Sequence, residues 1–324
     1  MSQPTSPPAP PDGVVRVERL TKTFGHVRAV DDLTFEVRPG RVTGFLGPNG
    51  AGKTTTLRML LGLVRPTSGT ATIGGRRYAE LPRPTSVVGA ALEAASFHPG
   101  RTALDHLRTY APQVPVTDAR AREVLATVGL AEVAGRRVGG FSLGMRQRLA
   151  LATTLLGDPQ VLILDEPANG LDPEGIRWLR VFLRSLAAQG RTVLVSSHVL
   201  SEVEQTVDDV VIIAGGRLVH ASSLAELAAL TTTRVRVVSP DADGLARLVQ
   251  ENGWRLGPDG AGPGWVELEG VETPQVGAAA FRAGLELHTL SRVDPGLEGL
   301  FLELVSRGAP GPVQQPGVDG RAVA

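Results

Sequence analysis

The hydrophobic pattern of the chain indicates two kinds of strand. Apolar and polar residues alternate over residues 14–20 and 33–37, which predicts strands of an antiparallel sheet with one buried face. Short unbroken apolar runs at 42–46, 161–164 and 193–196 instead indicate parallel strands that are covered on both faces. Helical patterns lie between these runs, at 54–64, 103–110, 119–128, 142–156 and 174–188. This alternation of strands and helices predicts an α/β fold with a parallel sheet.

The pattern changes after about residue 232, where shorter elements follow one another. Strands are predicted at 234–238, 254–256, 265–269 and 286–290, and helices at 242–251, 274–283 and 297–305. Up to residue 290 this order is β-α-β-β-α-β, which is the order of a ferredoxin-like module.

The two ends of the chain are rich in Pro and Gly and poor in periodic apolar residues. We expect residues 1–13 and 307–324 to be disordered tails. The remainder divides into a large domain at 14–230 and a small α+β accessory domain at 231–306.

Composition narrows the classes of protein that the chain can represent. Lys plus Arg and Asp plus Glu number 33 each, so no net charge points to nucleic acid or to an anionic membrane. The chain has no cysteine, which excludes disulfides, thiolate catalysis and Cys-ligated metal sites. The Pro-rich residues 1–12 lack the pattern of a secretory signal, and no stretch approaches the roughly 18–20 apolar residues of a membrane span. If the protein moves a compound across a membrane, another chain is expected to provide the path.

A glycine-rich segment between a predicted strand and a predicted helix carries the clearest chemistry. Residues 47–54 read G-P-N-G-A-G-K-T, which matches the phosphate-loop pattern G-x-x-x-x-G-K-[ST]. Glycines let successive backbone N–H groups converge on phosphate oxygens, and the following helix adds the positive end of its dipole. Lys53 is expected to neutralise the β- and γ-phosphates of ATP, Thr54 to place its hydroxyl on Mg²⁺, and Thr55 to contact the α-phosphate. The expected nucleotide-binding residues here are Gly47, Asn49, Gly50, Gly52, Lys53, Thr54 and Thr55.

Two acids end the apolar run at 161–164, and this is the edge at which open α/β sheets bind ligands. We expect Asp165 to hold Mg²⁺, directly or through water. Glu166 is expected to polarise the attacking water as the general base of ATP hydrolysis.

A third segment lies between the phosphate loop and the acidic strand and identifies a family. Residues 141–148 read F-S-L-G-M-R-Q-R and occupy the place of the L-S-G-G-Q signature of the ABC ATPases. The sequence therefore resembles that family over about residues 14–230. The resemblance implies a P-loop NTPase core with an antiparallel β-subdomain and a helical subdomain. Ser142 suits the start of a helix and Gly144 permits close backbone approach, so both are expected to contact the γ-phosphate.

The resemblance extends to three further positions. Asp172, in the stretch N-G-L-D at 169–172, matches the loop that couples two sites across a dimer of the family. His198 matches the switch histidine that contacts the γ-phosphate, and we expect it to take part in catalysis. Phe24 matches the aromatic residue that stacks on adenine, although an aromatic side chain at a strand end is as often part of a core.

The sequence departs from the family pattern in two places. Leu143 and Met145 replace residues of the signature. Glu93 stands where the family has a glutamine that ligates Mg²⁺; a carboxylate still ligates the metal but adds negative charge beside the phosphates. We therefore expect altered metal dependence or altered coupling, and not inactivity.

The resemblance also implies partners. Two copies of the chain, or two paired nucleotide-binding subunits, are expected to hold ATP and Mg²⁺ between them and to drive a separate transmembrane permease from the cytoplasmic face of the membrane. The signature, Glu93 and the apolar stripe at 297–304 resemble ATP subunits of daunorubicin- and bacitracin-type drug exporters, although that stripe equally suits the packing face of a terminal helix. The alternative is a non-transport ABC ATPase of translation or DNA repair. The single cassette, the neutral charge and the absence of a heptad insertion disfavour it.

Overall fold

The computed structural model describes residues 13–92, 97–110, 114, 117–231, 234–293 and 296–308. These residues form two compact units. The first unit comprises the chain up to Ser222 together with the part from Leu304 onward, and the second unit is Ser223–Glu303. Most of the two expected tails lies outside the described residues, but Arg307 and Gly308 belong to helix α11 (Gly296–Gly308).

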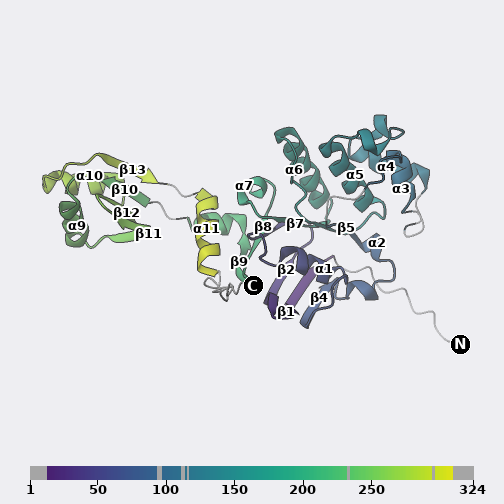
Figure 1. Ribbon diagram of the computed structural model, residues 1–324, viewed down its shortest axis with the longest axis horizontal. Coiled ribbons are helices and arrows are strands. Elements are labelled where there is room, and N and C mark those ends of the chain that lie inside the picture. The colour runs from purple at the N-terminus through teal and green to yellow at the C-terminus, as the bar shows by residue number, and fades with distance from the viewer. Residues whose placement is uncertain are drawn as a thin grey trace, which may run out of the picture. The chain divides into compact units, whose positions relative to one another are not determined.

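A six-stranded sheet forms the centre of the first unit, in the order β5-β6-β7-β3-β8-β9 (Figure 1). Its strands are β3 (Val42–Leu46), β5 (Val88–Ala91), β6 (Val161–Leu164), β7 (Thr192–Ser197), β8 (Asp209–Ala214) and β9 (Arg217–Ser223). The pairs β5–β6, β6–β7, β7–β3 and β3–β8 are parallel. Every residue of β3, β6 and β7 is buried, because helices or a second sheet cover both faces. The expected parallel sheet is therefore confirmed.

The second sheet of this unit has three antiparallel strands in the order β2-β1-β4. They are β1 (Val15–Phe24), β2 (Val27–Val37) and β4 (Ser68–Ile73). Val15 and Val17 are fully buried on one face of β1, as the alternating pattern predicts, and Leu20 is buried after a register shift that follows Val17. Strand β2 begins at Val27, six residues before the alternating pattern predicted at 33–37. Its first part pairs with β1 in an irregular register, and Asp32 there has a φ of 51°, so the simple alternation is interrupted.

Helices cover the six-stranded sheet, and a group of helices lies beside its β5 edge (Figure 1). The helix α1 (Lys53–Leu60) contacts β2 and β4, whereas α6 (Pro173–Ala188) contacts β3 and β7. The helices α3 (Ala103–Arg108), α4 (Asp118–Thr127) and α5 (Leu143–Leu155) pack together, and α5 also packs on β5. Short helices α2 (Pro84–Val87) and α7 (Leu200–Val203) complete the unit. Among the described residues, no helix is both long and apolar enough to cross a bilayer.

The second unit begins with α8 (Leu224–Ala229) and contains a four-stranded antiparallel sheet in the order β11-β12-β10-β13. Its strands are β10 (Arg234–Val238), β11 (Arg255–Gly262), β12 (Trp265–Glu269) and β13 (Thr289–Val293), and its helices are α9 (Ala242–Glu251) and α10 (Thr273–Arg282). The order β-α-β-β-α-β and this strand arrangement confirm the ferredoxin-like prediction. The last strand, β13, lies three residues later than predicted. Its position is set by antiparallel pairing with β10, in which Thr289 lies opposite Val238 and Val293 lies opposite Arg234.

A buried ion pair lies inside the second unit. Arg234 on β10 has its Nη1 3.4 Å from Oε1 of Glu267 on β12, and its Nη2 2.6 Å from Oε2 of Glu303 on α11. The side chain of Glu267 is only 2% exposed. A buried carboxylate of this kind needs its cation, since desolvation of an unpaired charge is costly.

Candidate functional site

The phosphate loop lies between β3 and α1, as the sequence predicts. Two of its glycines have no room for a side chain. A Cβ on Gly47 would lie 2.4 Å from the carbonyl oxygen of Ile213, and one on Gly52 would lie 2.5 Å from that of Ala29. Gly52 also has a φ of 100°, which residues with a side chain rarely adopt. The backbone of this loop therefore depends on glycine, and it turns directly into the first helical residues of α1.

Lys53 is 6% exposed and points its ammonium group back into the loop. Its Nζ donates to the carbonyl oxygen of Gly47 at 2.6 Å and to that of Pro48 at 3.3 Å. The same Nζ lies 3.4 Å from Oε1 of Glu166. A buried cation is thus held among oxygen atoms at the place where the sequence predicts phosphate.

The two acids after β6 reach this loop although β7 lies between β6 and β3 in the sheet. Thr54 donates through its hydroxyl to Oδ2 of Asp165 at 2.7 Å. Glu166 has a φ of 49°, a left-handed conformation that costs a residue with a side chain about 1–3 kcal/mol. The turn at Glu166 directs its carboxylate toward Lys53 and away from the buried strand.

His198 follows β7 and completes the group. Its Nδ1 lies 2.8 Å from Oε2 of Glu166. One carboxylate therefore links the histidine on β7 to the lysine of the phosphate loop.

These side chains surround one cavity of about 290 Å³. It is lined by Pro48, Asn49, Gly50, Ala51, Gly52, Lys53, Thr54, Thr55, Glu166, Asn169 and His198. Asp165 reaches the cavity through its hydrogen bond to Thr54, and Gly47 through its hydrogen bond to Lys53. Segments that are far apart in the sequence thus contribute the cation, the acids and the histidine to a single site.

Three predicted residues lie elsewhere. Ser142, Gly144 and Asp172 line a different cavity, of about 350 Å³, between the starts of α5 and α6. Ser142 caps α5 by accepting from the N–H of Met145 at 3.2 Å, and Asp172 caps α6 by accepting from that of Gly175 at 2.8 Å. Within one chain these residues therefore do not line the cavity around Lys53.

Phe24 and Glu93 complete the predicted set. Phe24 ends β1 with a half-exposed ring, over which Nζ of Lys22 lies 4.7 Å from the ring centroid. It does not line the cavity around Lys53. Glu93 lies outside the described residues.

Comparisons with known proteins decide the family. A family model described as ABC transporter matches residues 30–169. The bacitracin transport ATP-binding protein BcrA of Bacillus licheniformis is 45% identical over 210 residues, which are 64% of this chain and 69% of that protein. The chain belongs to the ABC transporter ATP-binding protein family. It is accordingly an ATP-binding, ATP-hydrolysing subunit whose partner is a membrane permease.

Other relatives of this ABC subunit cover as much of the chain as BcrA does, or more. The Nod factor export ATP-binding protein I of Ralstonia nicotianae is 33% identical and spans 93% of this chain and 97% of its own length. The lantibiotic transport ATP-binding protein SrtF of Streptococcus pyogenes is 36% identical over 64% of this chain and 89% of its own length. A solved ATP-binding subunit of an ABC transporter superposes with a TM-score of 0.60 at 29% identity, over 66% of this chain and 91% of that structure. Residues 233–298 match a domain family of unknown function.

The sequence analysis of the ABC subunit missed three polar residues near these sites. Asn169 lines the cavity around Lys53, and Gln147 on α5 donates to the carbonyl oxygen of Pro167 at 2.9 Å. Ser196 is fully buried and contacts both acids. Asn169 and Ser196 stand in segments that the motifs cover, but no pattern in the sequence shows which side chain of such a segment turns inward.

The residues of the ABC subunit fit a magnesium ion. Thr54 and Asp165 present a hydroxyl and a carboxylate in contact, and these are hard oxygen ligands of the kind that Mg²⁺ prefers. Across the described residues no cluster of three or more His, Cys, Asp or Glu side chains offers a complete protein cage.

Proposed function

We propose that two copies of this chain clamp Mg-ATP between them, and that its hydrolysis drives a separate permease that exports an antibiotic or a similar compound. The observation that carries the proposal is the convergence of Lys53, Thr54, Asp165, Glu166 and His198 on one cavity. Ser142 and Gly144 line another cavity, so a second chain is needed to bring the signature to the same phosphate.

The first wall of the site binds the triphosphate. The phosphate loop and the N-terminus of α1 line the cavity, and the N–H groups of such a loop and helix start favour an anion. Lys53 exchanges its contacts with loop carbonyls for the β- and γ-phosphates. Thr54 and Asp165 hold Mg²⁺, which would neutralise charge on the phosphate oxygens during transfer.

Glu166 is the proposed general base. In the described structure one of its oxygens lies near Lys53 and the other near His198. When phosphate takes up the charge of Lys53, Oε1 becomes available to polarise a water molecule, while His198 keeps hold of Oε2. The histidine therefore orients the base and lies close enough to the cavity to contact the γ-phosphate.

The signature helix of the second copy is the proposed opposite wall. Ser142 is exposed at the N-terminus of α5, and the N–H groups of that helix end favour an anion. Leu143 is half-exposed with its Cδ2 beside Gly170, and Ser142 stays exposed, so this departure from the family signature leaves the helix end accessible. Phe24 is proposed to stack on adenine, with Lys22 on one face of its ring.

A mixing experiment tests the composite site. Lys53→Ala destroys the loop of each copy and Ser142→Ala destroys the signature of each copy, so either variant alone is expected to hydrolyse ATP poorly. A mixed dimer contains one site with both defects and one intact site. The mixture is expected to hydrolyse ATP faster than either variant alone. No gain on mixing, with both variants folded, would reject the two-copy site. Ser185→Ala, on the exposed face of α6, is the matched control for the serine substitution.

Export is proposed because the relatives named above transport bacitracin or lantibiotics or export Nod factor. These names do not favour the alternative in translation or DNA repair. We place the chain at the cytoplasmic face of the membrane, with residues 14–230 as its nucleotide-binding domain and 231–306 as its accessory domain. Co-expression with a membrane permease should raise bacitracin tolerance of a sensitive host, and Glu166→Gln should remove that gain. An unchanged tolerance would argue against this class of substrate.

A further inference from the structure

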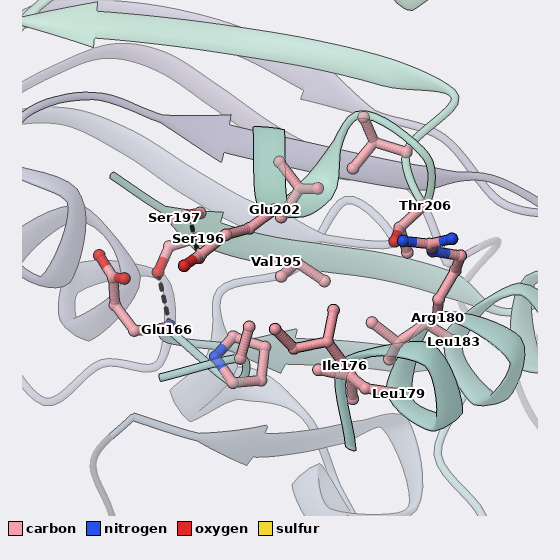
Figure 2. A pocket seen from close by; sticks show the side chains of 14 residues that line it. Glu166, Ile176, Leu179, Arg180, Leu183, Val195, Ser196, Ser197, Glu202 and Thr206 are labelled. Atoms are coloured by element: carbon pink, nitrogen blue, oxygen red, sulfur yellow. Dashed lines mark hydrogen bonds between the residues drawn. The ribbon is translucent and has the colours of Figure 1, made fainter. Parts of the chain in front are cut away.

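A single buried hydroxyl connects the two acids of the site. Ser196 lies on β7 and is fully buried. Its hydroxyl donates to Oδ1 of Asp165. It also accepts from the backbone N–H of Glu166 at 2.9 Å (Figure 2). A serine hydroxyl has one proton to donate and two lone pairs with which to accept, so this side chain can serve both partners at once.

The bond to Asp165 fixes which oxygen faces the phosphate loop. With Oδ1 held by Ser196, Oδ2 is the oxygen that accepts from Thr54 at 2.7 Å. A rotation of this carboxylate would break both hydrogen bonds. Ser196 therefore sets the orientation of the Asp165 carboxylate, from the side opposite to the proposed metal.

The bond to the N–H of Glu166 holds a strained turn. Glu166 has a φ of 49°, and its own carbonyl oxygen accepts from the N–H of Asn169 at 3.1 Å. The Ser196 hydroxyl accepts from the N–H of Glu166, so both backbone polar groups of Glu166 are hydrogen-bonded. Two residues further along the chain, His198 contacts the carboxylate of Glu166. The end of β7 thus holds the proposed base at its backbone and at its side chain.

We propose that Ser196 is a positioning residue for ATP hydrolysis, and that its hydroxyl aligns Asp165 for the metal and Glu166 for the attacking water. The proposal rests on the proposed function, because it acts only through these two acids. Ser196 itself does not line the cavity around Lys53. It lines a second, mostly apolar cavity (Figure 2), together with Leu179, Val195 and Val203, and Glu166 lines both cavities.

That apolar cavity allows a matched pair of variants. Ser196 lines this cavity of about 20 Å³, so we expect the cavity to take up a methyl group added at residue 196. Ser196→Thr keeps the hydroxyl, and Ser196→Val has the same shape without it. Ser196→Ala is a third variant that removes the hydroxyl and adds no bulk, and it serves if the larger side chains impair folding.

The test compares kcat, KM for ATP and metal binding among these variants at equal thermal stability. We expect Ser196→Val and Ser196→Ala to lower kcat by about 10–100-fold, as the loss of a supporting hydrogen bond commonly does, with little change in KM. Ser196→Thr should retain most of kcat. Mn²⁺ titrated into the protein with a non-hydrolysable ATP analogue, followed by electron paramagnetic resonance, should bind about 10–100-fold more weakly to the Val variant than to the Thr variant.

The outcomes separate this inference from the function on which it rests. Equal kcat for the Val and Thr variants, while Glu166→Gln abolishes turnover, would overturn the role of Ser196 and leave the proposed function intact. Equal Mn²⁺ binding would overturn the alignment of Asp165. Normal turnover of Glu166→Gln would instead contradict the proposed function itself.

Discussion

Nδ1 of His198 lies 2.8 Å from Oε2 of Glu166, so the histidine and the proposed base act as one unit. The two residues come from the ends of neighbouring parallel strands, β7 and β6. The histidine orients the carboxylate through Oε2, while Oε1 lies 3.4 Å from Nζ of Lys53.

The first prediction follows from this pair. His198→Ala is expected to lower kcat by about 100-fold or more, because the carboxylate loses the contact that fixes its direction. ATP binding, measured by fluorescence of a labelled nucleotide, should change much less. His220→Ala is a matched control, since His220 on β9 bonds Ser222 and does not line the cavity. Equal losses in both variants would point to damage of the fold.

Glu166→Gln is expected to bind ATP and to hydrolyse it slowly. The amide keeps the shape of the side chain but is a far weaker base, so the loss in kcat should reach about 10²–10⁴-fold. Since the bound nucleotide persists, the variant should form a stable ATP-dependent dimer in analytical ultracentrifugation. Hydrolysis near the wild-type rate would remove Glu166 from the mechanism.

Lys53→Met is expected to weaken ATP binding. Methionine keeps the apolar stem of this buried side chain but has no charge to offer the phosphates. A hydrogen bond to a charged group contributes about 1.5–3 kcal/mol, so affinity should fall by about 10–100-fold or more. Isothermal titration with ATP measures the change, and circular dichroism checks the fold. Unchanged affinity would place the phosphates elsewhere.

A buried histidine in the helical region predicts a pH dependence of stability. His106 packs between Phe97 and Tyr110, and among the described residues neither of its ring nitrogens has a hydrogen-bond partner. Burial lowers the pKa of His106 below its ordinary value of 6.5, and the charge of Arg101 lowers this pKa further.

The stability of the fold at low pH depends on how many protons the folded and unfolded chains bind at His106. Below about pH 6.5 the unfolded chain takes up a proton at this residue that the folded chain does not, so the free energy of unfolding falls as the pH drops toward the lowered pKa. His106→Phe should remove this part of the dependence in urea unfolding at pH 8, 6.5 and 5. His26→Gln, in the exposed turn after β1, is the control and should not alter the slope.

The ion pair of the second unit gives a prediction on stability. Glu267→Leu removes the most buried partner of Arg234, which keeps only Glu303. Breaking such a pair typically costs about 3–5 kcal/mol, and we expect about 3 kcal/mol because one partner remains. Chemical unfolding followed by fluorescence of Trp254 and Trp265 measures the loss. Glu251→Ala, at the exposed end of α9, should cost far less. Equal costs would show that the pair adds nothing.

Contiguous motifs made much of the site predictable from the sequence. The loop at Lys53 and the acids at 165 and 166 each depend on neighbours in the chain, so local patterns are enough to place them. Ser196 acts across 31 and 30 residues, and its contacts follow only from the pairing of β6 with β7.

The strands of the fold were also predictable only where the local sequence pattern marks them. Strands β3, β6, β10 and β12 begin and end as predicted, because buried runs mark β3 and β6 and an alternation of apolar and charged residues marks β10 and β12. Strands β4 and β9 were not predicted, since small or polar residues form them and they carry little hydrophobic signal. The position of β13 depends on its pairing with β10, and the local alternation of apolar and polar residues contains no information on that pairing.

The chain leaves the first unit at Ser222 and returns to it at Leu304, and a Cβ on Gly308 of α11 would lie 2.5 Å from Cγ2 of Val219. The second unit is therefore inserted into the sequence of the first unit, and the chain connects the two units at two points. A stop codon placed before the second unit would also delete the end of α11, which belongs to the first unit. Engineers who wish to remove or exchange the module should excise it internally and rejoin the flanking segments with a short linker.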